Sequence, residues 1–428
     1  MTRAKWYRHH ARAARIAILF SIFFTHPCQA AGAWLTEAGG TDMGMAGAGR
    51  AAMSQDAAAL AANPAAIGGL PRTTMTVALM PLALDLEFRG HADPADSATN
   101  DSSVIPAGSL FGVYRADRLS LGAGLYSYMG LGFDLGNEWA GRRLIERADL
   151  TTFNVAPSVA WRLTDRLHLG ASLAAQYAST RAELAVGNDG RFYGPPFGLP
   201  EGQIELSGNS WAGVAHLGLL FQATPDTSFG IAWTSGAEHS IDQHVDPRHV
   251  HPVLVALIPP RVELELTLPQ QLTLSASTAF SPTTTLAVST GWQDWSVMGG
   301  SSLSTRASAP LFPDGLHDTW HASVGIRRQL RAPWTLTAGI AYDSDPSVND
   351  DMPAYFPTAE QTRLAGGIEY KLSENHTLRA AFSVVNQGKV RVERGAYPIP
   401  LPGTEPVQGS FSPGRIYVLA VAADLGVD

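Results

Sequence analysis

The side chains that could do covalent or metal chemistry are few. The sequence contains no Gly-x-Ser-x-Gly and no His-Glu-x-x-His, two spacings that mark common hydrolase sites. Asp242, His244 and Asp246 alternate along one predicted strand and so share a face, where carboxylate and imidazole groups could hold a metal ion. We favour a solvated strand end for these three residues. The sequence therefore predicts no enzyme, no metal site and no cofactor.

Two segments that should face water are instead apolar, which points to ligand binding. They span 187–200 and 248–260. Contiguous exposed apolar side chains commonly mark a binding surface, so we expect a groove for a hydrophobic ligand. The alternative is that the two segments only pack on each other, and both interpretations can hold. The apolar residues are Phe192, Tyr193, Phe197, Leu199, Val253, Leu254, Val255, Leu257 and Ile258.

The composition narrows the class of protein that must carry these segments. Charged residues make up 16% of the 428-residue chain, against about 25% in ordinary soluble proteins. Mean hydropathy is close to zero, yet the longest apolar run, 16–24, is shorter than the roughly twenty residues of a membrane helix. In a transmembrane barrel, apolar and polar residues alternate along each strand, so the chain can be apolar on average without a long apolar run. The net charge of −8, without a basic patch, argues against nucleic-acid binding.

The first thirty residues have the pattern of a secretory signal. Basic residues from Arg3 to Arg15 precede the apolar run, and the small residues Cys28 and Ala30 precede the expected cleavage site. Residues 1–30 are therefore predicted to be removed. Because Cys28 is the only cysteine, the mature chain would contain no disulfide.

Residues 31–71 are predicted to form a plug. This segment is rich in Ala and Gly, and its glycines disfavour both a long helix and a good strand. Asp56 is expected to cap one short helix, and Asn63 before Pro64 ends it. A compact small-residue segment ahead of a long β chain suits a body packed inside that β structure. A disordered arm is the alternative, but such arms are usually charged and polar.

From residue 72 to 428 the sequence alternates as β-strands do. About fourteen strand-like segments are joined by alternating short and long connections, the mark of an outer membrane barrel. The predicted fold is therefore all-β: a transmembrane antiparallel β-barrel with an N-terminal plug (hatch) in its lumen. In 153–161, Phe153, Val155 and Trp161 share the face predicted for lipid, whereas Asn154 lies on the other. One aromatic girdle is predicted beside the short turns, from Tyr114, Trp161, Phe221, Phe229, Phe280, Trp334 and Tyr370.

The sequence resembles the long-chain fatty-acid transporter (FadL-type) family of outer membrane proteins, which also includes aromatic-hydrocarbon uptake channels. The resemblance covers essentially the whole mature chain. Its most specific parts are the run from Asp56 to Asn63-Pro64-Ala65 and the segment 318–343. Four further segments also carry the resemblance: AGAWLTEAG at the mature start, GNSWAGVAHLGLLF (208–221), GWQDWS (291–296) and RLAGGIEYKLS (363–373). The family implies a fourteen-stranded barrel blocked by an N-terminal hatch.

The resemblance also implies a route: capture by an apolar groove on the third and fourth outer loops, a deeper pocket, and sideways escape through the wall. It places the wall opening at Gly130, close to Gly132, and glycine in a strand often marks a kink. Ordinary glycines in a tapering barrel are the alternative.

For a carboxylate, the resemblance implies a basic pocket residue at Arg181, and His317 lies where the family can carry Lys. Strict alternation from Leu169 and Leu173 places Arg181 outward, however, so its orientation stays open. Arg327, Arg363 and Arg379 fall on lumen-facing positions, where pairing with lumen acids such as Glu263, Glu265 and Glu369 is the favoured interpretation.

We therefore expect a Gram-negative outer membrane channel that takes up hydrophobic molecules, long-chain fatty acids first, with hatch movement by residues 31–71. Aromatic hydrocarbons by the same route are the alternative, and a hydrophilic porin or an outer membrane lipase fits less well. The expected partners are the hydrophobic ligand, outer membrane lipid and lipopolysaccharide, and the expected state is a monomer.

Overall fold

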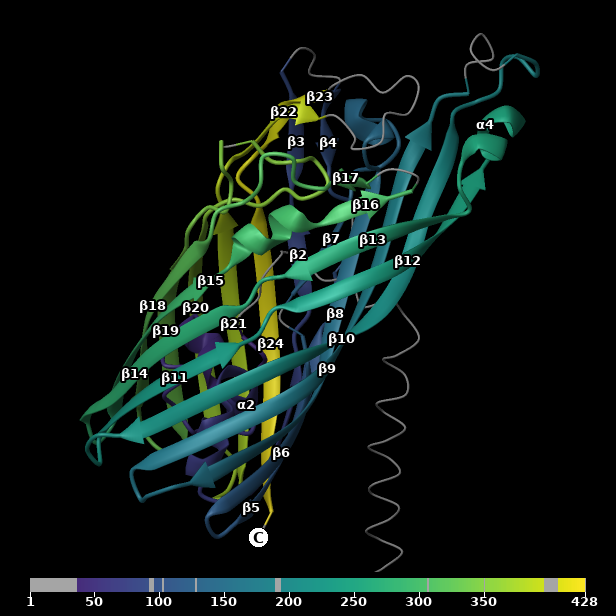
Figure 1. The fold of residues 1–428 in the computed structure, drawn as a ribbon. Helices are drawn as coiled ribbons and strands as arrows, with labels where there is room; N and C mark the ends of the chain where they lie inside the picture. The colour runs from purple at the N-terminus through teal and green to yellow at the C-terminus, as the bar shows by residue number, and fades with distance from the viewer. Residues whose placement is uncertain are drawn as a thin grey trace, which may run out of the picture.

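A computed structural model describes residues 37–91, 96–101, 104–127, 129–188, 194–305, 308–349, 351–395 and 407–427. The predicted signal, the start of the N-terminal segment, and Phe192 and Tyr193 lie outside these described residues. The strands close into a fourteen-stranded antiparallel barrel, in which β1 pairs with both β5 and the last strand, β24 (Figure 1). Within the described ranges, no helix has the length and apolar character needed to cross a membrane.

The wall strands follow the chain in order, and several consist of two consecutive pieces. They are β1 (Thr73–Leu79) with β2 (Leu82–Asp85), β5 (Gly108–Ala116), β6 (Leu119–Tyr126) with β7 (Gly130–Asp134), β8 (Arg147–Arg162), β9 (Leu167–Val186), β10 (Gly202–Gln222), β11 (Thr227–Thr234) with β12 (Ala237–Arg248), β13 (Arg261–Leu268) with β14 (Gln271–Ser281), β15 (Thr284–Gln293), β18 (Thr319–Gln329), β19 (Trp334–Asp343), β20 (Gln361–Lys371), β21 (His376–Gln387) and β24 (Arg415–Val427). The short β16 (Ser302–Ser304) and β17 (Ser308–Pro310) extend the wall beside β13.

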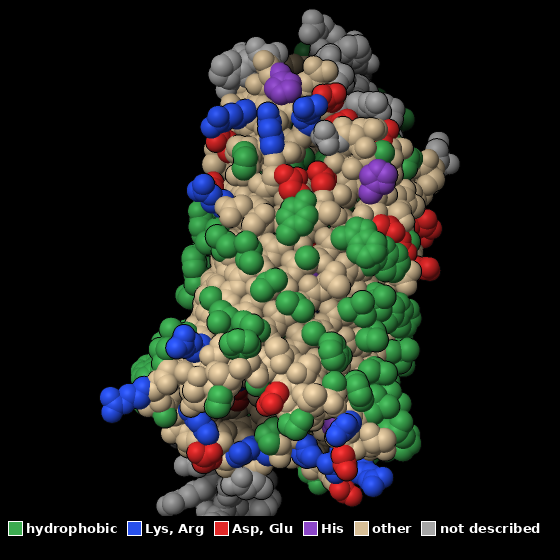
Figure 2. Space-filling model, turned by 90° about the vertical axis from the view of Figure 1, so that its left-hand side faces the viewer, with side chains coloured by type: hydrophobic (Ala, Val, Ile, Leu, Met, Phe, Trp, Pro, Cys, Tyr) green, Lys and Arg blue, Asp and Glu red, His purple; other side chains and the backbone are tan. Residues whose placement is uncertain are grey.

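Alternation along the strands gives the barrel an apolar outer face. In β8, Val155 and Trp161 are exposed, whereas Thr152 and Asn154 are buried on the lumen side, as the sequence predicts. Figure 2 shows hydrophobic side chains around the middle of the barrel and charged ones toward both ends. Six of the seven predicted girdle residues are exposed and Tyr370 is partly buried; the six are Tyr114, Trp161, Phe221, Phe229, Phe280 and Trp334. A lipid-facing band flanked by aromatic residues is the expected surface of a membrane barrel.

The N-terminal segment (residues 37–71) lies inside this barrel (Figure 1). It contains η2 (Thr41–Met45), α2 (Ala59–Ala62) and η3 (Pro64–Gly69). Its backbone amides bond to wall side chains: Gly49 N–H donates to Oγ of Ser289 at 2.9 Å and Ala51 N–H to Oγ of Ser275 at 3.2 Å. These contacts satisfy backbone groups that neither helix nor sheet would satisfy.

Glycines in the wall make room for this segment. A Cβ on Gly170 would lie 2.1 Å from the backbone N of Ala65, and one on Gly339 would lie 2.1 Å from the carbonyl O of Met45. A Cβ on Gly218 would lie 1.9 Å from Oδ1 of Asn63. Only glycine permits the two backbones to approach this closely, so the wall is shaped to the segment.

The outer end of the barrel is closed by loops. The small sheet of β3 (Glu87–Gly90), β4 (Ala98–Thr99), β22 (Val390–Gly395) and β23 (Val407–Phe411) lies there (Figure 1). Phe88 packs edge-on against Trp139 and Phe411, with ring centroids 5.1 and 5.2 Å apart. These rings join an apolar cluster that also includes Leu60 of the N-terminal segment. Short helices η5 (Ala140–Arg143), α4 (Pro252–Leu257) and η6 (Trp295–Gly300) complete the loops.

Candidate functional site

The third wall strand is interrupted. Its first piece, β6, pairs with β5 as far as Leu125, which lies opposite Leu110. Its second piece, β7, contains Gly130 and Gly132 and, among the described residues, pairs only with β8. At its far end Asp134 contacts the outer loop, because its backbone N–H donates to Oδ1 of Asn100 at 2.9 Å. The wall beside β5 therefore lacks a continuous hydrogen-bond ladder along this stretch.

Side chains of β8 satisfy the carbonyl groups that this interruption frees. The hydroxyl of Thr152 donates to the carbonyl O of Met129 at 2.5 Å, and Nδ2 of Asn154 donates to that of Tyr126 at 3.4 Å. Nε2 of Gln176 donates to Oδ1 of Asn154 at 3.0 Å. His239 of β12 bonds to Oε1 of Gln176 and to the hydroxyl of Ser210 in β10. Four of these side chains are buried: Thr152, Asn154, Gln176 and His239. Because buried polar groups need partners, this network makes the interruption a built feature of the wall.

The lumen behind the interruption is apolar. Phe111 stacks on Tyr126 with ring centroids 5.4 Å apart, and both rings are buried. Met129 and Phe133 belong to the same apolar cluster, which runs from the N-terminal segment to the outer loops. A hydrophobic molecule at this level would contact apolar side chains on several sides.

The two apolar outer loops are joined to each other by polar groups. Nδ2 of Asn188 donates to the carbonyl O of His249 at 2.6 Å, and the backbone N–H of His251 donates back to Oδ1 of Asn188 at 2.8 Å. His251 also caps α4, since its Nδ1 accepts from Val253 N–H at 3.3 Å. The loops thus contact each other, as the alternative interpretation of the sequence expects.

Several apolar side chains of these loops nevertheless face outward. Phe197 is 68% exposed and Leu257 is 72% exposed, and Val253 and Val255 are exposed as well. Leu254 is buried, and Leu199 and Ile258 are partly buried. Phe192 and Tyr193 are outside the described residues. The groove predicted from these loops stays a prediction.

The structure places neither candidate carboxylate-binding residue in the lumen. Arg181 lies on the outer face of β9, as strict alternation indicates, and its guanidinium bonds to Glu183 at 2.8 Å and Glu205 at 3.1 Å. His317 is exposed in the loop between β17 and β18, where its backbone N–H donates to the carbonyl O of Pro346. Neither residue is therefore part of the candidate lumen site.

The three arginines predicted to face the lumen are held by acids. Arg327 bonds to Glu369 at 2.6 Å, Arg363 pairs with Glu37, and Arg379 pairs with Asp424. Pairing with lumen acids is the interpretation that the sequence favours for these arginines. Two of the three acids predicted for it are nevertheless on the other side of the wall, since Glu263 and Glu265 are exposed on the outer face of β13.

Asn63 holds the turn between α2 and η3. Its Oδ1 accepts from Ala65 N–H at 2.9 Å, and its Nδ2 donates to the carbonyls of Ala51 at 2.7 Å and Leu219 at 3.0 Å. Pro64 stands at the first position of η3, where its missing N–H costs no hydrogen bond. The Asn63-Pro64-Ala65 motif thus ties three parts of the molecule together.

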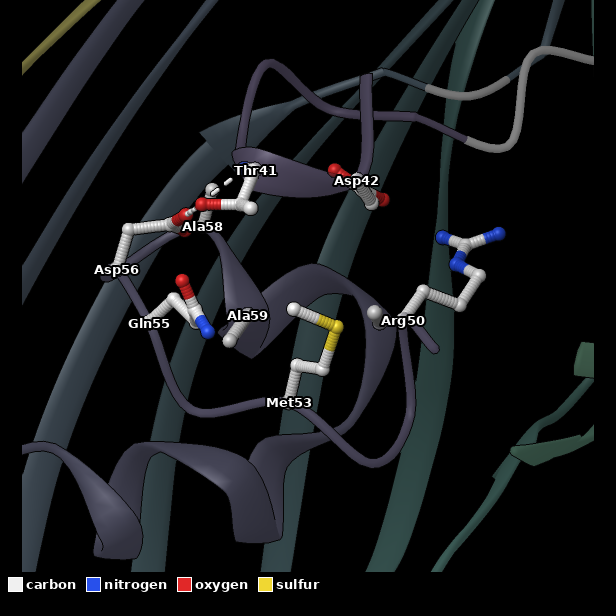
Figure 3. A pocket seen from close by; sticks show the side chains of 9 residues that line it. Thr41, Asp42, Arg50, Met53, Gln55, Asp56, Ala58 and Ala59 are labelled. Atoms are coloured by element: carbon white, nitrogen blue, oxygen red, sulfur yellow. Dashed lines mark hydrogen bonds between the residues drawn. The ribbon is translucent and has the colours of Figure 1, made fainter. Parts of the chain in front are cut away.

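A small cavity lies within the N-terminal segment. Figure 3 shows Asp42 and Arg50, from different turns of the segment, among the residues that line it. Asp56 accepts from Thr41 N–H and from the Thr41 hydroxyl, each at 2.8 Å. Sequence reasoning missed Arg50 and Asp42; charged residues in a segment otherwise built of Ala and Gly were the available signal.

A closed barrel with an apolar outer band, a filled lumen and an interrupted third strand defines a class of outer membrane transport protein. The chain belongs to the family described as outer membrane protein transport protein (OMPP1/FadL/TodX), which it matches over residues 21–420. The protein is accordingly an outer membrane β-barrel of a family of hydrophobic-substrate transporters.

Two named relatives align with this chain along most of their length. The chain is 24% identical over 397 residues to a long-chain fatty acid transport protein of Escherichia coli O6:H1, covering 85% of this chain and 89% of that one. It is 22% identical over 399 residues to outer membrane protein P1 of Haemophilus influenzae, covering 83% and 86%.

Two solved structures share the fold. A Pseudomonas aeruginosa FadL homologue has a TM-score of 0.81 at 17% identity and covers 92% of this chain and 100% of its own. The Ralstonia pickettii toluene transporter TbuX has a TM-score of 0.65 at 20% identity, covering 92% and 99%.

Proposed function

We propose that this protein takes up long-chain fatty acids across the outer membrane and releases them sideways into the bilayer. The observation that carries the proposal is the interruption between β6 and β7, which faces an apolar lumen on one side and the lipid-facing wall on the other. The fatty-acid class is supported by the name of the E. coli relative.

The energetics favour a staged apolar route. Each buried CH₂ group gains about 0.8 kcal/mol, so a sixteen-carbon chain gains on the order of 10 kcal/mol when it leaves water. A water-filled pore cannot use this gain. Exposed apolar residues of the outer loops, such as Phe197 and Leu257, provide a first site, and the apolar cluster beneath them provides the next.

In the proposed mechanism the N-terminal segment acts as a hatch. It occupies the lumen through hydrogen bonds that can exchange, such as those of Asn63, and through ion pairs such as Arg379–Asp56 at 3.7 Å. A small displacement would shift ligand from the deeper pocket toward the opening at Gly130 and Gly132. The protein acts as a monomer in contact with lipid and lipopolysaccharide.

A second candidate substrate class is the aromatic hydrocarbons. It is supported by the name of TbuX, whose structure shares this fold, and by the apolar lining beside Phe111 and Tyr126. The same route serves either substrate, because neither the outer loops nor the wall opening requires a charged ligand.

The test is uptake by cells that lack their own transporter and express this chain. Labelled oleate should accumulate well above the level of vector-only cells, and Asn63→Ala combined with Pro64→Ala should lower the rate while the barrel still folds. Gly213→Ala, on the outer face of β10 with no atom within 4 Å of the added Cβ, is the control. Accumulation of toluene but not oleate would select the second substrate class. Accumulation of neither, with folded barrel at the cell surface, would refute the proposal.

A further inference from the structure

Arg50 differs from the other buried arginines in having no partner. Among the described residues, Arg50, Arg363 and Arg379 are buried, and the last two form ion pairs with Glu37 and Asp424. The backbone N–H of Arg50 donates to the carbonyl O of Gly47 at 3.4 Å, but its side chain makes no hydrogen bond to any described residue. The guanidinium has no described carboxylate within 4.0 Å, and its Nε is buried without a partner. Since a buried charge is costly unless paired, this guanidinium is poised for an anion.

Asp42 and Asp56, which line the same cavity, are not full partners for Arg50. Asp56 is committed to Thr41 and to Arg379. Asp42 forms no ion pair with Arg50, although the charge of Arg50 acts to lower the pKa of Asp42. Burial has the larger effect and raises this pKa to about 7. Near neutral pH this carboxyl is therefore protonated for much of the time, and the charge of Arg50 is only partly balanced.

The surroundings of Arg50 combine polar and apolar groups. Its side chain borders the small cavity of the N-terminal segment, where Met53, Ala58 and Ala59 are among the apolar residues of the lining (Figure 3). The charge of Arg50 also acts on His216 of β10 and Asp343 of β19, so the guanidinium lies between two sides of the lumen.

We infer that Arg50 binds the carboxylate of an amphipathic ligand when the ligand reaches the N-terminal segment. The inference rests on the proposed function, in which that ligand is a fatty acid. A planar guanidinium can hold a carboxylate through two parallel hydrogen bonds, which are stronger than bonds between neutral groups. The site thus gives the hatch a contact that a neutral hydrocarbon cannot make.

The experiment compares two probes that differ only at the polar end, oleate and oleyl alcohol. Binding of each to the purified full chain in detergent is measured by titration calorimetry. Arg50→Gln should weaken oleate binding by about tenfold to a hundredfold and leave oleyl alcohol binding within about twofold. Arg50→Lys should keep part of the affinity, because it keeps the charge but loses the planar fork.

Two further variants separate binding from a structural role. Asp42→Asn removes a competing acid. It should tighten oleate binding by about twofold at pH 7 and by more at pH 8, where Asp42 is mostly ionised in the wild type, and a merely structural Arg50 would not produce this pH dependence. Arg328→Gln, an exposed change at the short-turn end of β18, should alter neither probe. Heat-modifiable migration in gel electrophoresis verifies that each barrel is folded.

The outcomes distinguish this inference from the proposed function. Equal oleate affinity in the wild type and Arg50→Gln overturns the role of Arg50 and leaves fatty-acid uptake standing. Equal loss of both probes in Arg50→Gln also overturns it, because the effect would then be on the fold of the segment. Failure of the wild type to bind oleate, whether or not it binds oleyl alcohol, overturns both the carboxylate site and fatty-acid uptake.

Discussion

Replacing Gly218 by Ala should loosen the N-terminal segment without unfolding the barrel. The added Cβ would lie 1.9 Å from Oδ1 of Asn63 and 3.0 Å from the backbone N of Ala65. Ordinary contact begins near 3.4 Å, so Asn63 must move by more than about 1 Å. It cannot move so far and keep all three of its hydrogen bonds.

The magnitude follows from those bonds. Asn63 bonds to Ala65, Ala51 and Leu219, and a typical intramolecular hydrogen bond contributes about 0.5–1.5 kcal/mol. Losing most of them costs about 3 kcal/mol, which increases the population of the opened segment about a hundredfold. The matched control is Gly213→Ala on the same strand, where the added Cβ meets no atom within 4 Å. The general effect of Gly→Ala on the unfolded chain is common to both variants and cancels.

Amide hydrogen exchange in detergent is the assay. Residues 41–70 should exchange about a hundredfold faster in Gly218→Ala than in the wild type, and the wall strands should be unchanged. Gly213→Ala should match the wild type throughout. Equal protection of the segment in the two variants would refute the idea that the wall glycines are fitted to it.

Three further outcomes are expected. The stability of the N-terminal segment should fall as pH rises from about 4 to about 7, because burial raises the pKa of Asp42 from 3.8 to about 7 and the folded state holds the extra proton. Hydrogen exchange of residues 41–70 should therefore become faster over that pH range. In Asp42→Asn the stability of the segment should no longer depend on pH in this range. Thr152→Val removes the donor to Met129 and should cost about 1–3 kcal/mol in local stability of β7, measured by exchange, whereas Thr152→Ser should retain protection. Leu257→Asp, on the exposed face of α4, should raise the apparent KM for oleate uptake several-fold and leave the melting temperature unchanged; an unchanged KM would exclude this helix from capture.

Local sequence patterns were sufficient for the wall. The face that Val155 and Trp161 share could be predicted because successive side chains of a strand point to opposite sides, whatever the strand packs against. The same rule predicts that Arg181 points outward, whereas the family resemblance implies a lumen position. In the structure Arg181 lies on the outer face, as the rule predicts. Where the two sources of inference conflicted, the one with a direct steric cause was the better guide.

Contacts between distant parts of the chain could not be read in this way. Glu263 and Glu265 are predicted as lumen acids, but this prediction is wrong because the register of β13 turns them outward. Glu37 and Asp424 pair with the lumen arginines instead. Nothing local marks Thr152 and Asn154 as partners of carbonyls in another strand. Their role exists only because the interruption of β6 and β7 frees those carbonyls beside them.

The sequence by itself determined the alternation, the rhythm of short and long connections and the small-residue N-terminal segment, because each depends on the steric properties of neighbouring residues. Tertiary structure alone decided that Gly218 receives Asn63, that Arg363 meets Glu37, and that Arg50 stays without a partner. These pairings join residues far apart in the chain, and they arise from how the closed wall and its contents fit together in space.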